Sequence, residues 1–442
     1  MNKTPTTIQT PPTRILLLYA VGQMGWSLAA FAPSSLLNYF YLPPEDGKIL
    51  FPLLITLPLL IGLINGVTRG LDAFIDPYIA NLSDRSTAKI GKRKAFMLIA
   101  FLPFAALSFL IFTPPIAHPS TLNTVWIGIM LFAFHLFLSM YTTPYTALIS
   151  ELGHTKSARL NISAYVSLAF ALGAAIGNQA YSLQSYFEQS MPPMQAFQAA
   201  VGIFALLSAV FMLVPILFVD EKRYSLSHPS EQLPLEAIKS VWANKNFRAF
   251  ALSDCIYWVA LTFIQSGIVY YITVLLRLDK NLISSFTPVV LILLLALYYP
   301  VMRLAVRYGK KQLLQISFLL FAFAYGFVAL LGKLPLSTNT QALLLLAIIL
   351  FPMGVFSILP NAVVADIADK DAQKTGDHKA GMFFGIRILI MKLGVAVANM
   401  SFSWLLLLGK STDNDLGIRL TAALAMLGCL AGFAIFRNYK EE

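Results

Sequence analysis

The sequence predicts an all-α membrane protein with twelve transmembrane helices, arranged as two six-helix bundles around a central cavity. Of its 442 residues 57% are hydrophobic and only 12% are charged, whereas soluble domains carry about 25% charged residues. Apolar segments long enough to span a bilayer, which takes about 20 residues, recur along the whole chain. Similar basic motifs also lie about half a chain length apart, as expected for a membrane protein built from two related halves.

Twelve segments meet the length requirement for a membrane span, and several exceed it enough to require tilting. Both cysteines, Cys255 and Cys429, lie inside these segments, so neither a disulfide framework nor a metal-ligand spacing is available. The predicted spans are residues 15–40, 50–81, 95–114, 122–149, 160–182, 195–219, 247–276, 284–305, 312–333, 341–365, 381–408 and 416–437.

The distribution of basic residues gives the orientation. With these spans, 23 of the 32 Lys and Arg residues fall on the side of the N-terminus, six on the other side and three within spans. The positive-inside rule therefore predicts that both termini are cytoplasmic, in the plasma membrane (the inner membrane of a bacterium). The same imbalance explains the net charge of +11 without nucleic acid as a partner.

The two halves share a short basic motif. Gly91-Lys92-Arg93-Lys94 follows the second span, and Gly309-Lys310-Lys311 follows the eighth, 218 residues later. Between the halves, Leu235–Trp242 is either a short amphipathic helix at the cytoplasmic surface or a plain linker. The expected organisation is an N-terminal tail over 1–14, a first bundle over 15–219, a linker over 220–246, a second bundle over 247–437 and a C-terminal tail over 438–442.

One predicted span carries a column of polar residues. At about 100° per residue, Asn65, Arg69, Asp72 and Asp76 fall within roughly 60° of one another on a helix. A charge in hydrocarbon costs roughly 2.5–3.5 kcal/mol, so this face must meet protein or water rather than lipid. Asp72 and Asp76 lie one turn apart and would repel each other if both stayed ionised and unpaired. One of them must hold a proton or a Na⁺, or pair with a basic group.

Three further charges lie within predicted spans of the second half: Asp254, Arg387 and Lys392. A buried charge is stable only with a partner. We expect Arg387 to pair with Asp254, with an anionic substrate or a lipid headgroup as the alternative partner. The whole charged set could also be a salt-bridge cluster that locks the halves together, although such a lock is costly.

Several motifs resemble those of the glycoside–pentoside–hexuronide:cation symporters, a family of the major facilitator superfamily. They lie in three separate regions and follow the order of that family. These motifs are Arg69-x-x-Asp72-Ala73-x-x-Asp76-Pro77, Ser83-Asp84-Arg85 with Gly91-Lys92-Arg93, Pro144-Tyr145-Thr146-Ala147-Leu148 with Glu151, Ala365-Asp366-Ile367-Ala368-Asp369, Gly381-Met382-Phe383-Phe384-Gly385 and Lys392-Leu393-Gly394.

The resemblance implies the major facilitator fold and cation-coupled symport of a sugar or glycoside-like solute by alternating access. It assigns Asp72 and Asp76 to cation and substrate binding, with Arg69 in the same column and Lys392 as charge partner. These acids would be metal ligands only with Na⁺ as the coupling ion, and no other cofactor is expected. Thr142 stands where sodium-coupled members have an acid, which leaves H⁺ and Na⁺ both open.

Two further sets of residues are candidates for the transport cycle. Aromatic rings and amides suit a sugar, because they combine apolar stacking with directional hydrogen bonds. Candidates for lining the cavity are Gln23, Trp26, Asn38, Tyr141, Thr142, Thr143, Tyr145, Asp254, Tyr257, Trp258, Gln265 and Arg387. In the major facilitator pattern, ion pairs at the cytoplasmic end close one side of the transporter. The resemblance implies such a gate at Asp84, Arg85, Lys92, Arg93 and Asp366.

Other classes of function fit less well. The chain has no nucleophile–base arrangement, metal site or phosphate-cradling loop, so we expect no enzyme. Two alternatives remain: a lysophospholipid or amphiphile carrier on the same fold, and a receptor that resembles a transporter but does not transport. The expected partners are a small solute, sugar-like or amphiphilic, and membrane lipids, with the protein itself a monomer.

Overall fold

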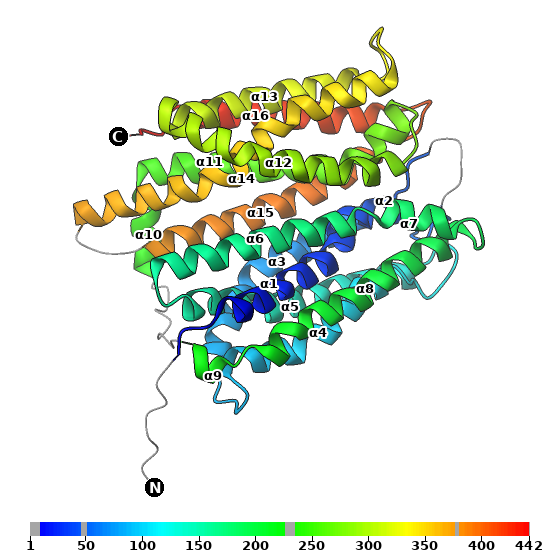
Figure 1. Cartoon of the computed structure of the whole chain (residues 1–442). Coiled ribbons are helices and arrows are strands. Elements are labelled where there is room, and N and C mark those ends of the chain that lie inside the picture. The colour runs from blue at the N-terminus through cyan, green and yellow to red at the C-terminus, as the bar shows by residue number, and fades with distance from the viewer. Residues whose placement is uncertain (1–8, 46–50, 226–234, 376–379, 442) are drawn as a thin grey trace. The chain divides into compact units, whose positions relative to one another are not determined.

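The computed structural model describes residues 9–45, 51–225, 235–375 and 380–441, and these form helices joined by loops, with no strand among them (Figure 1). Short breaks divide some of the long helices. Pro33, which has no N–H to donate, lies in a π-helical turn within the first of them. The first half contains α1 (Thr13–Phe31) continuing through η1 (Ala32–Leu36) into α2 (Leu37–Tyr41), α3 (Leu59–Asp84), α4 (Lys92–Leu110), α5 (Thr121–Leu152), α6 (Lys156–Gly177) with α7 (Ala180–Phe187), and α8 (Pro193–Phe218).

The second half repeats this arrangement of long helices after two short ones, α9 (Glu221–Tyr224) and α10 (Leu235–Ala243). The helix α10 lies where the sequence left a choice between a helix and a linker, so the helical alternative is confirmed. The long helices are α11 (Lys245–Tyr270) with η2 (Tyr271–Leu275), α12 (Asn281–Tyr308), α13 (Lys310–Leu330), α14 (Thr338–Thr375), α15 (Ala380–Leu406) and α16 (Leu416–Phe436).

Among the described residues, eleven helices are long and apolar enough to cross a membrane. The twelfth long helix, α3, has 26 residues but is more polar, because Arg69, Asp72 and Asp76 lie in its middle. Large apolar side chains such as Leu206 and Ile292 are 72% and 65% exposed, as expected where lipid rather than water is the solvent. The chain is therefore a multi-pass membrane protein, consistent with twelve spans in two bundles.

The chain divides into two compact units near the predicted boundary between the bundles, with two differences. The segment Tyr41–Ile49 and the segment Leu57–Gly70, which includes the first half of α3, group with the second unit instead of the first. One unit consists of Met1–Phe40, Leu50–Thr56 and Leu71–Gln232, and the other of Tyr41–Ile49, Leu57–Gly70 and Leu233–Glu442.

Small residues account for the grouping of α3. A Cβ atom on Gly62 would lie 2.9 Å from the Met400 carbonyl oxygen on α15, and one on Gly66 would lie 2.9 Å from the Met400 Cβ. Only glycine allows two helix backbones to approach this closely. Glycine likewise allows α6 to lie close to α1, where a Cβ on Gly173 would lie 2.5 Å from the Met24 carbonyl oxygen.

Two predicted helix ends were wrong. The second span begins at Leu59 rather than near residue 50, because Pro52 and Pro58 disfavour a helix at and before their positions. The tenth extends to Thr375 rather than ending near residue 365. Its extra turns contain Ala, Asp and Lys, and these residues continue a helix beyond the apolar segment without needing lipid contact.

Candidate functional site

The helix α3 turns its polar face inward and an apolar face outward. Asp72 is fully buried, while Phe74 and Tyr78 on other sides of the helix are 64% and 66% exposed. This orientation is the one that a bilayer favours, since lipid solvates apolar side chains but not charges. The polar column predicted from the sequence is therefore present, with Arg69 and Asp76 half-buried along it.

Ser139 on α5 joins the two carboxylates of the column. Its Oγ lies 2.5 Å from Asp72 Oδ1 and 2.6 Å from Asp76 Oδ1. Thr143, one turn further along α5, donates a hydrogen bond of 3.2 Å to the same oxygen of Asp76. Ser139 is fully buried, so these contacts form inside the first unit.

A hydroxyl group carries a single hydrogen, so Ser139 can donate to only one of the two acids at a time. At 2.5–2.6 Å the second contact also requires a hydrogen between the oxygens, because O–H···O⁻ bonds have lengths of about 2.5–2.7 Å. With both carboxylates ionised, two oxygen lone pairs would face each other there. Ser139 therefore places one hydroxyl group between the two carboxyl groups.

The two basic residues that the resemblance assigns to this site, Arg69 and Lys392, belong to the second unit. Arg69 precedes Asp72 by three residues on α3, and Lys392 is half-buried in the middle of α15. Both make contacts with other groups. The pairing of Lys392 with the acids of the first unit stays a prediction.

In the second unit, Arg387 on α15 binds Asp254 on α11 through two parallel hydrogen bonds. Its Nε lies 2.8 Å from Asp254 Oδ2, and its Nη2 lies 3.1 Å from Oδ1. The Nη1 group donates to Asn361 Oδ1 on α14 at 2.6 Å, and the guanidinium carbon lies 5.7 Å from the centre of the Phe250 ring. The pair expected from the sequence is thus present, and it compensates both charges in a fork geometry.

Three aromatic residues that the sequence proposes for the cavity pack against other residues of their own units. Tyr141 and Tyr145 are both fully buried, and their hydroxyls donate to the backbone oxygens of Met212 and Tyr19 at 2.9 and 2.8 Å. Tyr257 stacks on a phenylalanine ring at a centroid distance of 4.0 Å. Neither Tyr141 nor Tyr145 has an exposed surface in this structure, and their role in lining a cavity stays a prediction.

The remaining candidates differ in their surroundings. Gln23 is buried and accepts a hydrogen bond of 2.9 Å from Trp26 Nε1. Thr142 donates to a backbone oxygen of its own helix, at Leu138, and so does not reach the acids as Thr143 does. Asn38 is buried, Trp258 is half-buried and Gln265 is exposed.

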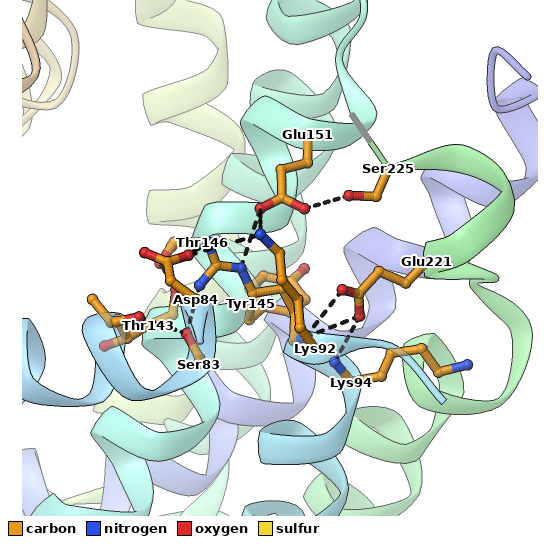
Figure 2. Close-up of polar contacts among 12 residues, drawn as sticks. Ser83, Asp84, Lys92, Lys94, Thr143, Tyr145, Thr146, Glu151, Glu221 and Ser225 are labelled. Carbon is orange, nitrogen blue, oxygen red and sulfur yellow. Dashed lines mark hydrogen bonds and ion pairs between the residues drawn. The ribbon is translucent and has the colours of Figure 1, made fainter. Parts of the chain in front are cut away.

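Three predicted gate residues of the first half, Asp84, Lys92 and Arg93, form a compact ion-pair network with Glu151 (Figure 2). Arg93 at the start of α4 pairs with Asp84 at the end of α3, and its Nε lies 3.1 Å from Glu151 Oε1 at the end of α5. Its Nη1 also donates to Ser83 Oγ at 2.5 Å. Lys92 lies within 4 Å of both acids. A buried guanidinium is stable only with such partners, so the network ties three helix ends together.

Sequence reasoning missed the acids that cap α4 and α13. Glu221 accepts from the backbone N–H groups of Arg93 and Lys94 at 3.0 and 2.9 Å, and Glu441 accepts from those of Lys310 and Lys311, both at 2.8 Å. Each acid lies just after the last long helix of its half, which is the sequence signal that could have identified it. Carboxylates favour helix N-termini, where N–H groups have no partner within the helix.

The other two predicted gate residues, Asp366 and Arg85, have different surroundings. Asp366 on α14 forms an ion pair with Lys310, which follows Gly309. The second half therefore also pairs a basic residue of its Gly-Lys motif with an acid. Arg85 is exposed at the end of α3. The sequence also did not reveal the contacts of Ser139 with the two acids and of Asn361 with Arg387. A hydroxyl or amide group within a span has many possible orientations, so its partner cannot be read from the sequence.

The fold is a bundle of membrane-length helices. Two acids, Asp72 and Asp76, face inward in one unit, and Arg387 and Asp254 compensate each other's charge in the other. This combination is that of a membrane transporter of the major facilitator class. The chain belongs to the MFS/sugar transport protein family, whose profile matches residues 18–436. This membership confirms the resemblance drawn from the sequence motifs, and it makes the chain a transporter of the sugar-symporter type.

The most informative relatives are named symporters and sugar transporters. The chain is 21% identical over 350 residues to the inner membrane symporter YicJ of Escherichia coli (strain K12), covering 78% of this chain and 73% of that protein. It is 25% identical over 352 residues to the isoprimeverose transporter of Lactiplantibacillus pentosus, covering 76% and 70%. A crystal structure of the nucleoside transporter NupG shares the fold, with a TM-score of 0.65 at 14% identity over 96% of this chain and 98% of that one.

Proposed function

We propose that this protein couples the entry of a neutral, sugar-like solute to the entry of a cation through the Asp72–Asp76 pair. In the proposed cycle, binding of the ion and the solute changes which charges are compensated, and this shifts the balance between two conformations. Several relatives, among them an isoprimeverose transporter, a raffinose carrier and a lactose permease, support a sugar as the solute.

The observation that carries the proposal is the position of Ser139 between the two carboxylates. Both of its short contacts can be hydrogen bonds only when the acid pair holds a proton. This supports H⁺ as the coupling ion in the arrangement described. Na⁺ is the competing ion, and it would bind the same two carboxylates together with the hydroxyl oxygens of Ser139 and Thr143.

The Arg387–Asp254 pair supports a neutral solute. The guanidinium already uses two of its donor groups on a carboxylate and a third on Asn361. An anionic solute that displaced Asp254 would leave a buried carboxylate uncompensated, which costs several kcal/mol. A hydroxyl-rich neutral solute can add hydrogen bonds to the edge of the pair without breaking it.

We further propose a monomer in the cell membrane with both termini in the cytoplasm. The excess of Lys and Arg on that side supports this orientation. The Arg93 network then lies at the cytoplasmic end, where it would close the first unit in one conformation and loosen in the other.

Reconstituted liposomes provide the test. Uptake of labelled sugars, uronates and lysophospholipids is measured with an inward H⁺ gradient, an inward Na⁺ gradient or neither. The proposal predicts sugar accumulation driven by the H⁺ gradient and lost in Asp72→Asn and Asp76→Asn. The matched control is Asp413→Asn, because Asp413 is an exposed loop acid.

Each other outcome has a defined meaning. Accumulation driven by Na⁺ alone would replace H⁺ as the coupling ion. Uptake of lysophospholipid in place of any sugar would identify an amphiphile carrier. Wild-type accumulation in both aspartate variants would refute the role of the acid pair.

A further inference from the structure

The segment that follows α2 is bound by elements of the second half of the chain. Residues up to Phe40 belong to the first unit, whereas Tyr41–Ile49 group with the second. The Tyr270 hydroxyl at the end of α11 donates to the Leu42 carbonyl oxygen at 2.7 Å, and both residues are buried. We call residues Leu42–Glu45 the strap.

The strap is also bound to the loop between α15 and α16. Lys410 Nζ forms an ion pair with the Glu45 carboxylate and donates to the Pro43 carbonyl oxygen at 2.8 Å. The Glu45 N–H donates to the Lys410 carbonyl oxygen, and the Thr412 N–H donates to the Glu45 carbonyl oxygen, both at 3.1 Å. Glu45 and Ser411 thus form a parallel β-bridge. Together with the bond from α11, these contacts satisfy three carbonyl oxygens and one N–H of the strap.

The loop between α15 and α16 holds its shape through its own hydrogen bonds. Asn414 Nδ2 donates to the Leu408 carbonyl oxygen at 3.1 Å, and the Ser411 N–H donates to the Asn414 carbonyl oxygen at 3.0 Å. Gly409 has a φ of +153°, and a Cβ there would lie 2.4 Å from Asn414 Oδ1, so only glycine fits. Lys410 is therefore presented by a preformed loop, which can receive or release the strap without refolding.

The strap is one part of a loop whose other part has different partners. Leu50–Thr56, in the same loop between α2 and α3, belongs to the first unit. There the Leu54 carbonyl oxygen accepts from Asn123 Nδ2 at 2.8 Å and from the Ser120 N–H at 3.3 Å. The strap is thus bound to the second unit while the chain before and after it belongs to the first. A movement of one unit relative to the other therefore pulls on the bonds of the strap.

The bonds between the strap and Lys410 are of a kind that can form and break. The side chain of Glu45 is 62% exposed and that of Lys410 is 15% exposed, so water can hydrate both charges when they separate, and such a pair adds little stability. Two π-helical turns lie next to the attachment. The turn η1 precedes the strap by the length of α2, and η2 begins directly after Tyr270. Such turns are frequent at functional sites.

We propose that the strap is a conformational latch, attached to Lys410 in the conformation described and detached in the other conformation of the transport cycle. This inference rests on the proposed function, because it assigns control of that cycle to one loop. The strap follows the first span, so it lies on the side of the membrane opposite the N-terminus. Its attachment would set how readily that side opens.

The first test cross-links the latch in protein reconstituted into liposomes, with both native cysteines replaced by alanine. E45C/S411C places thiols on the two residues of the β-bridge, and paired strands lie about 4.8 Å apart, which suits a disulfide. The matched control S337C/T340C joins two positions whose hydroxyls lie 2.7 Å apart before and at the start of α14, so it restrains one loop only. Loss of free thiols reports the cross-link, and uptake is measured before oxidation, after oxidation and after reduction.

The proposal predicts that uptake by E45C/S411C falls about tenfold or more on oxidation and returns on reduction, because the attached conformation can no longer be left. The control pair should keep its uptake when oxidised. Three results would overturn the proposal: no cross-link in E45C/S411C, uptake by the cross-linked protein at the reduced rate, or equal losses in both pairs.

A second test needs no solute. The reaction of the S411C thiol with maleimide is timed in nanodiscs, since Ser411 is half-buried beside the strap. K410M/S411C should react about fivefold faster or more, because the strap loses two contacts and is released more often. Loss of a nearby ammonium group would by itself raise the pKa of the thiol and slow the reaction, so a faster reaction reports exposure.

The matched variant K333M/S411C changes an exposed lysine in the loop before α14 and should react at the rate of S411C. An unchanged rate in K410M/S411C would overturn the latch whether or not a solute is transported. A faster reaction together with no uptake of any solute would refute the proposed function instead, so the two failures are distinguishable.

Discussion

Glu441 makes the same pair of contacts to the first turn of α13 that Glu221 makes to the first turn of α4. Each carboxylate accepts hydrogen bonds from two successive backbone N–H groups. Each also faces a glycine of positive φ, +118° at Gly91 and +84° at Gly309, where a Cβ would lie 2.3 and 2.8 Å from the acid. The basic motif that recurs after 218 residues therefore recurs together with its glycine and with an acid from a distant part of the chain, Glu221 in the first half and Glu441 in the second.

The first prediction concerns these two caps. Glu221→Ala should lower the free energy of unfolding by on the order of 2–3 kcal/mol, because buried N–H groups lose a charged acceptor. Glu441→Ala should cost less, since Glu441 is exposed and water can replace it. Thermal unfolding of the two variants in detergent checks this order. A larger loss in Glu441→Ala would contradict the assignment of burial as the cause.

The second prediction concerns Ser139. Ser139→Ala removes the hydroxyl shared by Asp72 and Asp76, and loss of one hydrogen bond to a charged group costs about 1.5–3 kcal/mol. Proton-driven uptake should therefore fall roughly tenfold or more, and its dependence on pH should change. The control is Thr142→Val, because Thr142 bonds only to its own helix. Equal losses in both variants would show that helix packing, rather than the acid pair, is affected.

The third prediction concerns the Arg387–Asp254 pair. Asp254→Asn alone leaves a guanidinium uncompensated and should destabilise the protein by about 3–5 kcal/mol, whereas Asp254→Asn combined with Arg387→Gln should recover most of that loss. Unfolding temperatures of the two single variants and the double variant form the test cycle. If the double variant is no more stable than Asp254→Asn, the two side chains are not coupled.

The polar column of α3 could be predicted from the sequence because a helix has a fixed period and lipid excludes charges. The Arg387–Asp254 pair could be expected for the same reason, since a buried charge needs a partner. The contact of Ser139 with both acids could not, because it depends on how α5 is rotated against α3. Whether Tyr141 and Tyr145 line a cavity could not be predicted either, because an aromatic ring in a span gives no sign of whether it faces a cavity or the core.

The fourth prediction concerns pH and the loop before α16. Arg419 binds both carboxylate oxygens of Asp415 and the backbone oxygens of Ala329 and Leu331. The hydrogen bonds that Arg419 donates to this carboxylate lower the pKa of Asp415 below its ordinary value of 3.8. The folded state therefore gains stability from the ionised acid above that value and loses it as the pH falls through the lowered pKa. The gain is small, because Asp415 is partly exposed and solvent screens the pair.

Unfolding temperatures of the wild type and Asp415→Asn, measured from pH 7 downwards, check this expectation. The wild type should be slightly more stable at neutral pH, and the difference should shrink as the pH falls through the ordinary pKa of an aspartate and then through the lowered pKa of Asp415, because the unfolded chain binds a proton first. The matched variant Asp413→Asn changes an exposed acid nearby and should show no such dependence. A difference that instead grows as the pH falls would mean that Arg419 does not stabilise the ionised form of Asp415.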